Sequence, residues 1–186
     1  MRKSIFLILS CVSLLACQGI PPITPTQRYN AAVTKLKDAT NEETRFYALN
    51  DASKQAFILG KTFEARQYAL TLLEMAPRFS KDWNYGNAIQ DGNLVLGRIS
   101  VQEGNIPEAK KFLIAAGKSP GSPQMDTFGP NMSLAKDLLN KGEKEVVLQY
   151  FELCRKFWEL HRGRLDEWSQ DVKENRMPDF GANLLY

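Results

Sequence analysis

Apolar residues along this chain recur every three or four positions, the spacing that places them on one face of an α-helix. The pattern begins near Thr26, and no convincing run of alternating β-branched residues follows it. It therefore predicts an all-α fold. The expected helices span residues 29–39, 46–56, 64–75, 87–103, 107–116, 131–141, 143–161 and 165–174.

Three glycines, Gly60, Gly104 and Gly142, lie in short turns between paired helices. When the chain is aligned on them, similar residues recur at fixed distances from each glycine. Small residues occur where two helices have to cross closely, and larger ones fill the space between crossings. The aligned sets are Ala52, Leu96 and Leu134; Ser53, Gly97 and Ala135; Ala65, Ala109 and Val147; Ala69, Leu113 and Phe151; Leu72, Ala116 and Cys154.

This pattern resembles the tetratricopeptide repeat (TPR), a helix–turn–helix unit of about 34 residues. The second copy matches best, with Gly97, Gly104 and Ala109 in register. The resemblance covers roughly residues 46–159 and implies a short α-solenoid of about three TPR-like helix pairs. The spacing departs from the repeat, because 44 and 38 residues separate successive turn glycines. A generic helical bundle whose tight turns use glycine is the alternative.

The two ends of such an array need helices that cover its apolar faces. The helix at 29–39 is expected to cap one end, and the last two helices are expected to cap the other, with Gly163 breaking the chain between them. Residues 177–186 carry no helical pattern and are expected to fold over as a tail. The helical domain is therefore expected to span residues 26–176.

The N-terminus has the parts of a secretory signal. Arg2 and Lys3 give a positive start, residues 5–15 are apolar, and Ala16 is a small residue at the expected cleavage point. Eleven helical residues rise only about 16 Å, roughly half the hydrocarbon thickness of a membrane. This makes the segment a poor permanent span. A buried N-terminal helix of a cytosolic protein is the alternative.

The sequence Leu-Leu-Ala-Cys that ends at Cys17 resembles the lipobox of bacterial lipoproteins. In that family the signal, here residues 1–16, is removed, and the cysteine carries a diacylglycerol and usually an N-acyl chain. The resemblance therefore implies a membrane anchor in the cell envelope, with residues 17–25 as an extended, proline-containing tether. Gln18, next to the cysteine, favours the outer membrane, facing the periplasm, if the cell is Gram-negative.

Cleavage changes the charge and the number of thiols. The whole chain has 24 basic and 21 acidic residues, and removal of Arg2 and Lys3 leaves 22 against 21. A nearly neutral body gives no reason to expect nucleic-acid binding. Cys11 leaves with the signal and Cys17 takes the lipid, so Cys154 remains as a single thiol that cannot form an internal disulfide. Its aromatic neighbours in the sequence predict that it is buried.

Candidate catalytic residues are few. The single histidine, His161, has no nucleophile near it in the sequence, and one histidine with one free thiol does not make a zinc site. Residues 104–111 imitate a phosphate-binding loop, but Ala109 replaces its second glycine and Lys111 its Ser/Thr, so a repeat turn explains the segment better. We therefore expect no enzyme activity, no metal and no cofactor beyond the covalent lipid.

In TPR proteins the first helix of each repeat lines a concave groove, and the resemblance implies that role for particular residues here. Lys54, Arg98 and Lys136 each stand six residues before a turn glycine and form a basic row. Such a row suits an acidic peptide or a C-terminal carboxylate. The alternative is that three exposed helix positions happen to be basic. The neighbouring groove positions are Asn50, Leu94, Met132 and Asn140.

Two classes of function fit these features. In the first, the chain is a membrane-anchored envelope lipoprotein that acts as a TPR-like scaffold or assembly factor for an envelope protein or peptide. In the second, it is an envelope enzyme or accessory protein whose helical body holds a glycan. A deep acidic cleft would favour the second class, and an extended groove without a titratable cluster would favour the first.

Overall fold

The computed structural model describes residues 23–185, and the regular structure in that range is entirely helical. The all-α fold class predicted from the sequence is confirmed. Nine α-helices and three short 3-10 helices follow one another along the described residues. They are α1 (Pro25–Lys37), α2 (Glu42–Ile58), α3 (Thr62–Met75), η1 (Ala76–Phe79), α4 (Tyr85–Gln102), α5 (Ile106–Gly117), α6 (Pro123–Phe128), α7 (Ser133–Leu139), α8 (Lys144–Cys154), η2 (Glu159–His161), α9 (Arg164–Lys173) and η3 (Gly181–Leu184).

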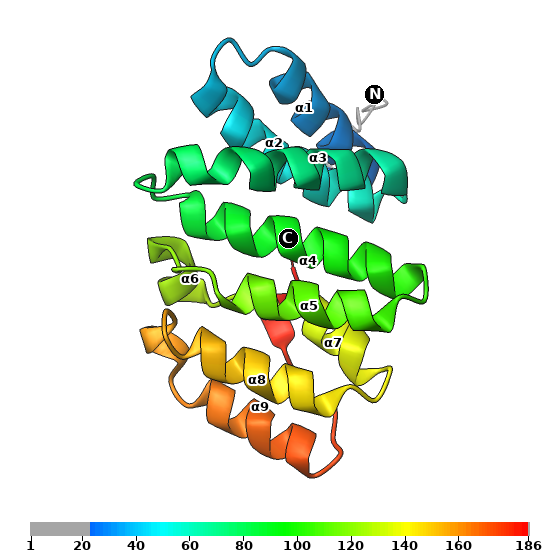
Figure 1. The fold of residues 1–186 in the computed structure, drawn as a ribbon, viewed down its shortest axis with the longest axis vertical. Helices are drawn as coiled ribbons and strands as arrows, with labels where there is room; N and C mark the ends of the chain where they lie inside the picture. Colours follow the sequence, from blue (N-terminus) through cyan, green and yellow to red (C-terminus); the bar gives the residue numbers. More distant parts are fainter. Residues whose placement is uncertain (1–22, 186) are drawn as a thin grey trace, which may run out of the picture.

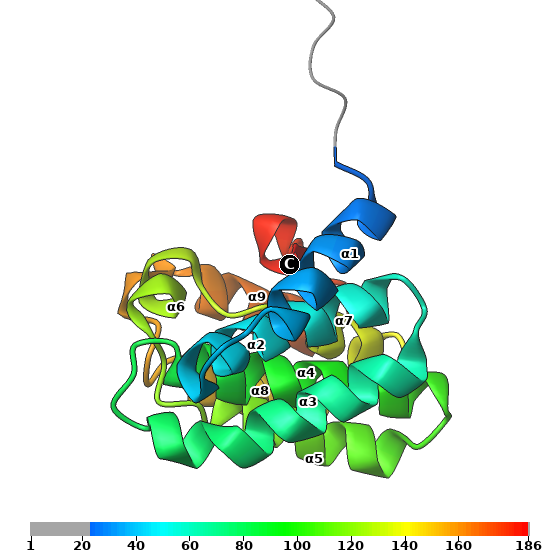
Figure 2. The same cartoon turned by 90° about the horizontal axis from the view of Figure 1, so that it is seen from above.

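The helices are stacked in chain order along the longest axis of the molecule (Figure 1). Each of the first four helices packs on the next one in the sequence. Beyond α5 the stack continues through α7, α8 and α9, while the short α6 lies at one side. Seen along the stack, α1, α6 and η3 lie on one side and α3 and α5 on the other (Figure 2). The stack therefore has two different long faces.

The three predicted glycine turns share one backbone geometry. Gly60, Gly104 and Gly142 have φ values of 75, 76 and 82°, in the left-handed region that glycine adopts without strain. The residue after each glycine donates its backbone N–H to the carbonyl five residues earlier, over 2.9, 2.8 and 3.0 Å. This pairing is the Schellman cap. Its recurrence confirms that these glycines close the hairpins α2–α3, α4–α5 and α7–α8.

The positions aligned on those glycines are buried, as predicted. Ala65, Ala109 and Val147 have exposed fractions of 0%, at the point where the second helix of each hairpin packs on the first. A Cβ added at Gly97 would lie 2.3 Å from the Leu134 side chain, so the absence of a side chain lets α4 and α7 approach closely. The other aligned members with exposed fractions of 0–1% are Ala52, Ser53, Ala69, Leu72, Leu96, Leu113, Ala116, Leu134, Ala135, Phe151 and Cys154.

We expect Ala109→Leu to lower the free energy of unfolding by about 1–3 kcal/mol, because the added methyl groups overpack a fully buried helix crossing. Lys110→Leu is the matched control. It removes a partly exposed ion pair with Glu143 (2.6 Å), which contributes at most about 1 kcal/mol. Urea unfolding of both variants measures the difference. Equal, small effects would show that Ala109 is not at a close crossing.

The long helix predicted for residues 143–161 is wrong, because α8 ends at Cys154. After this residue the chain turns, so that Phe157 packs on Gly121 and Trp158 packs on Gly129. An added Cβ would lie 2.5 Å from the Phe157 Cβ at the first glycine and 2.5 Å from the Trp158 ring at the second. A continued helix would point these two consecutive side chains about 100° apart. Tertiary packing of the two aromatic rings therefore overrides a helical sequence pattern that contains no proline or glycine.

The loop expected between the second and third hairpins contains a helix. Ser122 caps α6 by accepting the backbone N–H of Met125 over 3.0 Å. Asp126, on this helix, accepts the backbone N–H groups of Glu159 and Leu160 with its Oδ1, over 2.8 and 3.4 Å. These bonds satisfy the first two backbone N–H groups of η2, which have no partner within that short helix. Hydrogen bonds therefore join α6 to the segment that follows α8, and each stabilises the position of the other.

The predicted terminal helices are present, and α1 packs on α2 while α9 packs on α8. Gly163, with a φ of 83°, comes just before α9 as predicted, but the helix that it was expected to end stops earlier, at Cys154. In the tail, Gly181–Leu184 forms η3 and contacts the segment before α7. Among residues 23–185, no helix combines the length and apolar character needed to cross a membrane.

Candidate functional site

A groove of about 630 Å³ lies between α2, α4, the α6–α7 connection and the C-terminal segment. We call it the amide groove, because seven asparagine or glutamine side chains line it. Aromatic residues stand at its rim, and charged residues lie along the α2 and α4 walls. Its lining residues are Tyr47, Asn50, Asp51, Lys54, Trp83, Asn84, Asn87, Gln90, Asp91, Gln124, Met125, Thr127, Phe128, Gly129, Pro130, Asn131, Arg164, Ala182, Asn183 and Leu185.

The α4 wall carries amides at helical spacing. Asn84, Asn87 and Gln90 follow one another every three residues, so they share one face of the helix. All three are buried. Asn87 donates to Asn84 (2.9 Å) and to Gln124 on α6 (3.2 Å), and it accepts from Ser122 (2.7 Å). This network fixes the short α6 helix against α4 and so shapes one side of the groove.

Gln90 fixes the floor of the groove through a closed set of hydrogen bonds. Its amide nitrogen donates to the Tyr150 hydroxyl over 3.3 Å, and that hydroxyl donates to the Asn131 carbonyl over 3.1 Å. The backbone N–H of Asn131 in turn donates to the Gln90 side-chain oxygen over 3.2 Å. The three buried residues join α4, α8 and the segment before α7, so the floor is a rigid, satisfied polar structure.

The rim of the groove is aromatic. Trp83 and Phe128, which both line the groove, are 57% and 70% exposed. Trp83 stacks on Tyr47 with ring centroids 5.9 Å apart and planes inclined by 29°. Burial and a 2.6 Å hydrogen bond to Asp82 raise the pKa of Tyr47 to about 12, so its hydroxyl stays protonated at neutral pH. The rim therefore offers uncharged, flat surfaces to a bound molecule.

Two of the three cations of the predicted basic row face carboxylates. Lys54 on α2 pairs with Asp91 on α4 over 2.9 Å, and Arg98 on α4 pairs with Asp137 on α7 over 2.8 Å. Burial by itself lowers the pKa of Lys54, but the carboxylates of Asp91 and Asp51 outweigh it, so the pKa is raised. Lys54 is therefore charged, and its charge is balanced within the protein.

The structure brings only part of the predicted groove set together. Asn50 and Lys54 line the amide groove. Leu94 and Met132 have exposed fractions of 0% and belong to the hydrophobic core, so the prediction that they contact a ligand is wrong. Their helices present amides and ion pairs to the groove and turn these apolar side chains inward.

The other predicted positions lie away from the groove. Arg98 stacks over the Phe57 ring at 4.7 Å from its centroid, in addition to its ion pair. Lys136 is partly exposed on α7. Asn140 is exposed at the C-terminal end of α7, whereas Asn131, before the start of that helix, lines the groove. Cys17, the predicted lipidation site, lies outside the described residues.

Sequence reasoning missed the α4 amide face, the aromatic rim and the contribution of the tail. A signal for the amide face was present, because Asn84, Asn87 and Gln90 recur every three residues in a helix that is otherwise rich in apolar side chains. The contribution of Asn183 had no local signal, since it depends on the chain folding back by about 50 residues to Phe128 and Pro130.

The groups considered for chemistry lie apart from one another. Burial raises the pKa of the Cys154 thiol far above its usual range, so it stays protonated and unreactive. His161 accepts the backbone N–H of Gly163 with its Nδ1 over 3.2 Å. Within residues 23–185, no group of three or more His, Cys, Asp or Glu side chains is arranged to hold a metal ion.

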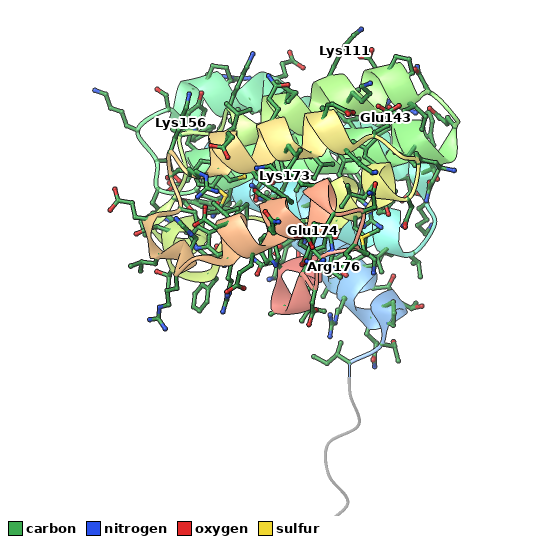
Figure 3. The ribbon with its side chains drawn as sticks, turned by 90° about the horizontal axis from the view of Figure 1, so that it is seen from below. Lys111, Glu143, Lys156, Lys173, Glu174 and Arg176 are labelled. Carbon is green, nitrogen blue, oxygen red and sulfur yellow. The ribbon has the colours of Figure 1, made fainter. Side chains whose placement is uncertain are left out.

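A second hollow of about 720 Å³ lies between α5 and α8, with Ile106, Ile114 and Val146 among its lining residues. Figure 3 shows Lys111 and Glu143 on this side of the molecule, with η3 at the opposite edge. Charges of both signs stand around the hollow, and it has no network of buried amides comparable to that of the amide groove. The amide groove is therefore the better candidate for selective binding.

No protein-family model, curated protein or solved structure matches this chain. The proposal for its function therefore depends on the geometry of the amide groove and on the sequence motifs.

Proposed function

We propose that this chain is a membrane-anchored envelope lipoprotein and that its body is a short TPR-like α-solenoid. In this proposal the body serves as an interaction scaffold, which holds a peptide segment of an envelope partner in the amide groove. The lipobox-like motif at Cys17 supports the anchor, and its neighbour Gln18 favours the outer membrane. The three equivalent Schellman turns and the buried positions aligned on them support the repeat.

The observation that carries the proposed binding function is the amide lining of the groove. Asn87 and Gln90 bond to other residues of the groove and hold its shape. An amide group that is left unpaired can bond to the carbonyl or N–H groups that alternate along an extended peptide. Asn50 is 5% exposed, and its side-chain oxygen has no hydrogen-bond partner among the described residues. An unsatisfied buried amide costs about 1–3 kcal/mol, so a rearranged, ligand-bound groove would gain by satisfying it.

The ionised side chains that line the amide groove suit an uncharged peptide better than an acidic one. The ionised groups in the groove are Asp51, Lys54, Asp91 and Arg164, so acidic and basic groups are balanced. Lys54 and Asp91 already pair with each other. The same balance gives no support to a glycan-cleaving site, which uses a pair of carboxylates on either side of the sugar bond.

The rim tryptophan provides the test of this proposal. We expect Trp83→Ala to weaken partner binding about tenfold or more, because exposed tryptophans at a groove commonly dominate binding energy. Phe63→Ala is the matched control, since Phe63 is 75% exposed on α3 and does not line the groove. The measurement is quantitative capture from detergent-solubilised envelope by residues 18–186, with each captured protein compared between the variants.

The proposal requires proteins that wild type and Phe63→Ala capture equally and that Trp83→Ala loses. Far-UV circular dichroism should be the same for all three proteins, because both replaced side chains are largely exposed. Capture of an uncharged peptide should also change little with added salt, whereas an acidic peptide held by the basic row would be released. Equal capture by folded Trp83→Ala and wild type would rule out the groove as the binding site.

A further inference from the structure

The C-terminal segment 181–185 lies along one edge of the amide groove. Figure 2 shows η3 on the same side of the stack as α1 and α6. The segment is held in place from upstream, where Phe180 is 2% exposed and packs edge-on against Trp168 with ring centroids 5.0 Å apart. The Trp168 indole N–H also donates to the Asp179 carbonyl over 3.0 Å. The anchor of the tail is therefore separate from the part that lines the groove.

The chain before α7 binds this segment through its main chain. The backbone N–H of Met132 donates to the Asn183 carbonyl over 2.7 Å. The Asn131 side chain donates to the Leu185 carbonyl over 3.0 Å, and the Ser133 hydroxyl donates to the Leu184 carbonyl over 3.4 Å. Three successive carbonyls thus accept from three successive residues, an arrangement suited to any peptide with a similar backbone path.

Two side chains of the segment contact the body: Leu184 is partly buried against the hydrophobic core, and Asn183 is held by hydrogen bonds. Asn183 is 6% exposed, and its side-chain nitrogen donates to the carbonyls of Phe128 and Pro130, both over 3.0 Å. These two carbonyls flank Gly129, where an added Cβ would lie 2.6 Å from that nitrogen. The glycine therefore allows the asparagine to enter. Leu185, by contrast, is 75% exposed and makes contact through its backbone.

The segment is also built to detach without disturbing its anchor. Gly181, directly after the buried Phe180, has a φ of 47° with open space around it, so it can act as a hinge. Ala182 and Leu185 are exposed. Removal of the segment would uncover the Phe128 and Pro130 carbonyls and the Met132 N–H, which are one donor and two acceptors facing the groove.

We propose that the edge of the amide groove formed by residues 128–133 is a peptide-binding subsite, which the chain's own residues 181–185 fill until a partner replaces them. The partner presents a short uncharged segment in which one asparagine lies among apolar residues. This inference rests on the proposed function, namely that the groove holds a peptide. It adds the chemistry of the partner and the means by which the free site is kept closed.

The test uses a peptide with the sequence of residues 181–186, labelled at its N-terminus, and measures fluorescence anisotropy. A chain that ends after Phe180 should bind it with saturation, and the intact chain should bind it at least tenfold more weakly, because the attached segment competes at high effective concentration. A peptide with leucine in place of Asn183 should bind the shortened chain at least tenfold more weakly, since two carbonyls lose their donor.

Absence of saturable binding by a folded shortened chain would overturn the inference. If the shortened chain does not fold, intact Asn183→Ala replaces it, since this variant weakens the attached segment without removing it. It should bind the labelled peptide at least tenfold more tightly than the wild type does, and equal binding would overturn the inference.

Partner capture separates this inference from the proposed function. The shortened chain should capture more of the partner that Trp83→Ala loses. If removal of the segment leaves that capture unchanged or reduces it, the segment is a fixed wall and the subsite inference fails, while the groove remains the binding site. If Trp83→Ala loses no partner but the peptide still binds the shortened chain, the proposed function fails instead.

Discussion

Replacing Gly86 with alanine is expected to destabilise the folded protein by about 3 kcal/mol, one of the larger effects available to a single methyl group. A Cβ at this position would lie 1.8 Å from the Gly121 carbonyl oxygen and 2.5 Å from its carbon. Both atoms belong to backbone, so no side chain can rotate away. The helix and the loop after α5 would have to separate, and the 2.7 Å hydrogen bond from Ser119 to the Gly86 carbonyl would be lost.

Gly92→Ala, in the same helix, is the matched control. There the new Cβ would lie 2.8 Å from the Leu73 side chain, which can shift, and alanine favours a helix over glycine by about 1 kcal/mol. We expect this variant to stay within about 1 kcal/mol of wild type. The free energies of unfolding in urea provide the comparison. Equal stability of the two variants would mean that the loop does not touch α4 at Gly86.

The hairpins could be predicted from sequence because their signals are local. A turn that needs a left-handed residue selects glycine, and Gly60, Gly104 and Gly142 each supply it. Small residues at fixed distances from these turns then mark the crossings, and the structure buries them. The turn glycine and the buried positions counted from it belong to one helix pair, so the hairpins could be predicted without information on contacts between distant segments.

The break after Cys154 and the helix at Pro123–Phe128 could not be predicted in the same way. Neither depends on residues in its own segment alone. Phe157 and Trp158 leave the helical path because Gly121 and Gly129 provide space for their rings, more than 25 residues earlier in the chain. Asp126 then satisfies the exposed backbone amides of Glu159 and Leu160. Local helix propensity is small enough for such packing to override it.

The basic row was assigned only from the distance of each residue to its turn glycine, and this distance does not indicate which residues the cations contact. The positions of Lys54 and Arg98 were derived correctly as equivalent, and both extend toward the next hairpin. Their carboxylate partners, Asp91 and Asp137, lie 37 and 39 residues later, close to the spacing between hairpins. Two cations of the row, Lys54 and Arg98, therefore form ion pairs between successive helix pairs. Lys54 and Arg98 stand at the same distance from their turn glycines, whereas Asp91 stands 13 residues before Gly104 and Asp137 stands five before Gly142, so alignment on the glycines finds the cations and misses their partners.

Lipidation has the largest expected effect on where the protein resides. Wild type should fractionate with membranes, and its extracted mass should correspond to loss of residues 1–16 plus a diacylglycerol and an N-acyl chain on Cys17. Each buried methylene contributes about 0.8 kcal/mol, so several acyl chains give durable attachment where one would be marginal. Cys17→Ser should lack the acyl mass and accumulate as an unprocessed precursor or a soluble periplasmic form.

Cys11→Ser is the control that the chain itself provides. It removes a thiol from the same N-terminal segment, six residues before Cys17, and should leave membrane attachment and acyl mass unchanged. Intact-mass measurement of the detergent extract distinguishes the variants. A wild-type protein that begins at Met1 without acyl mass would contradict the anchor. It would leave the amide groove, which residues between Tyr47 and Leu185 line, as a peptide site to be tested without a membrane.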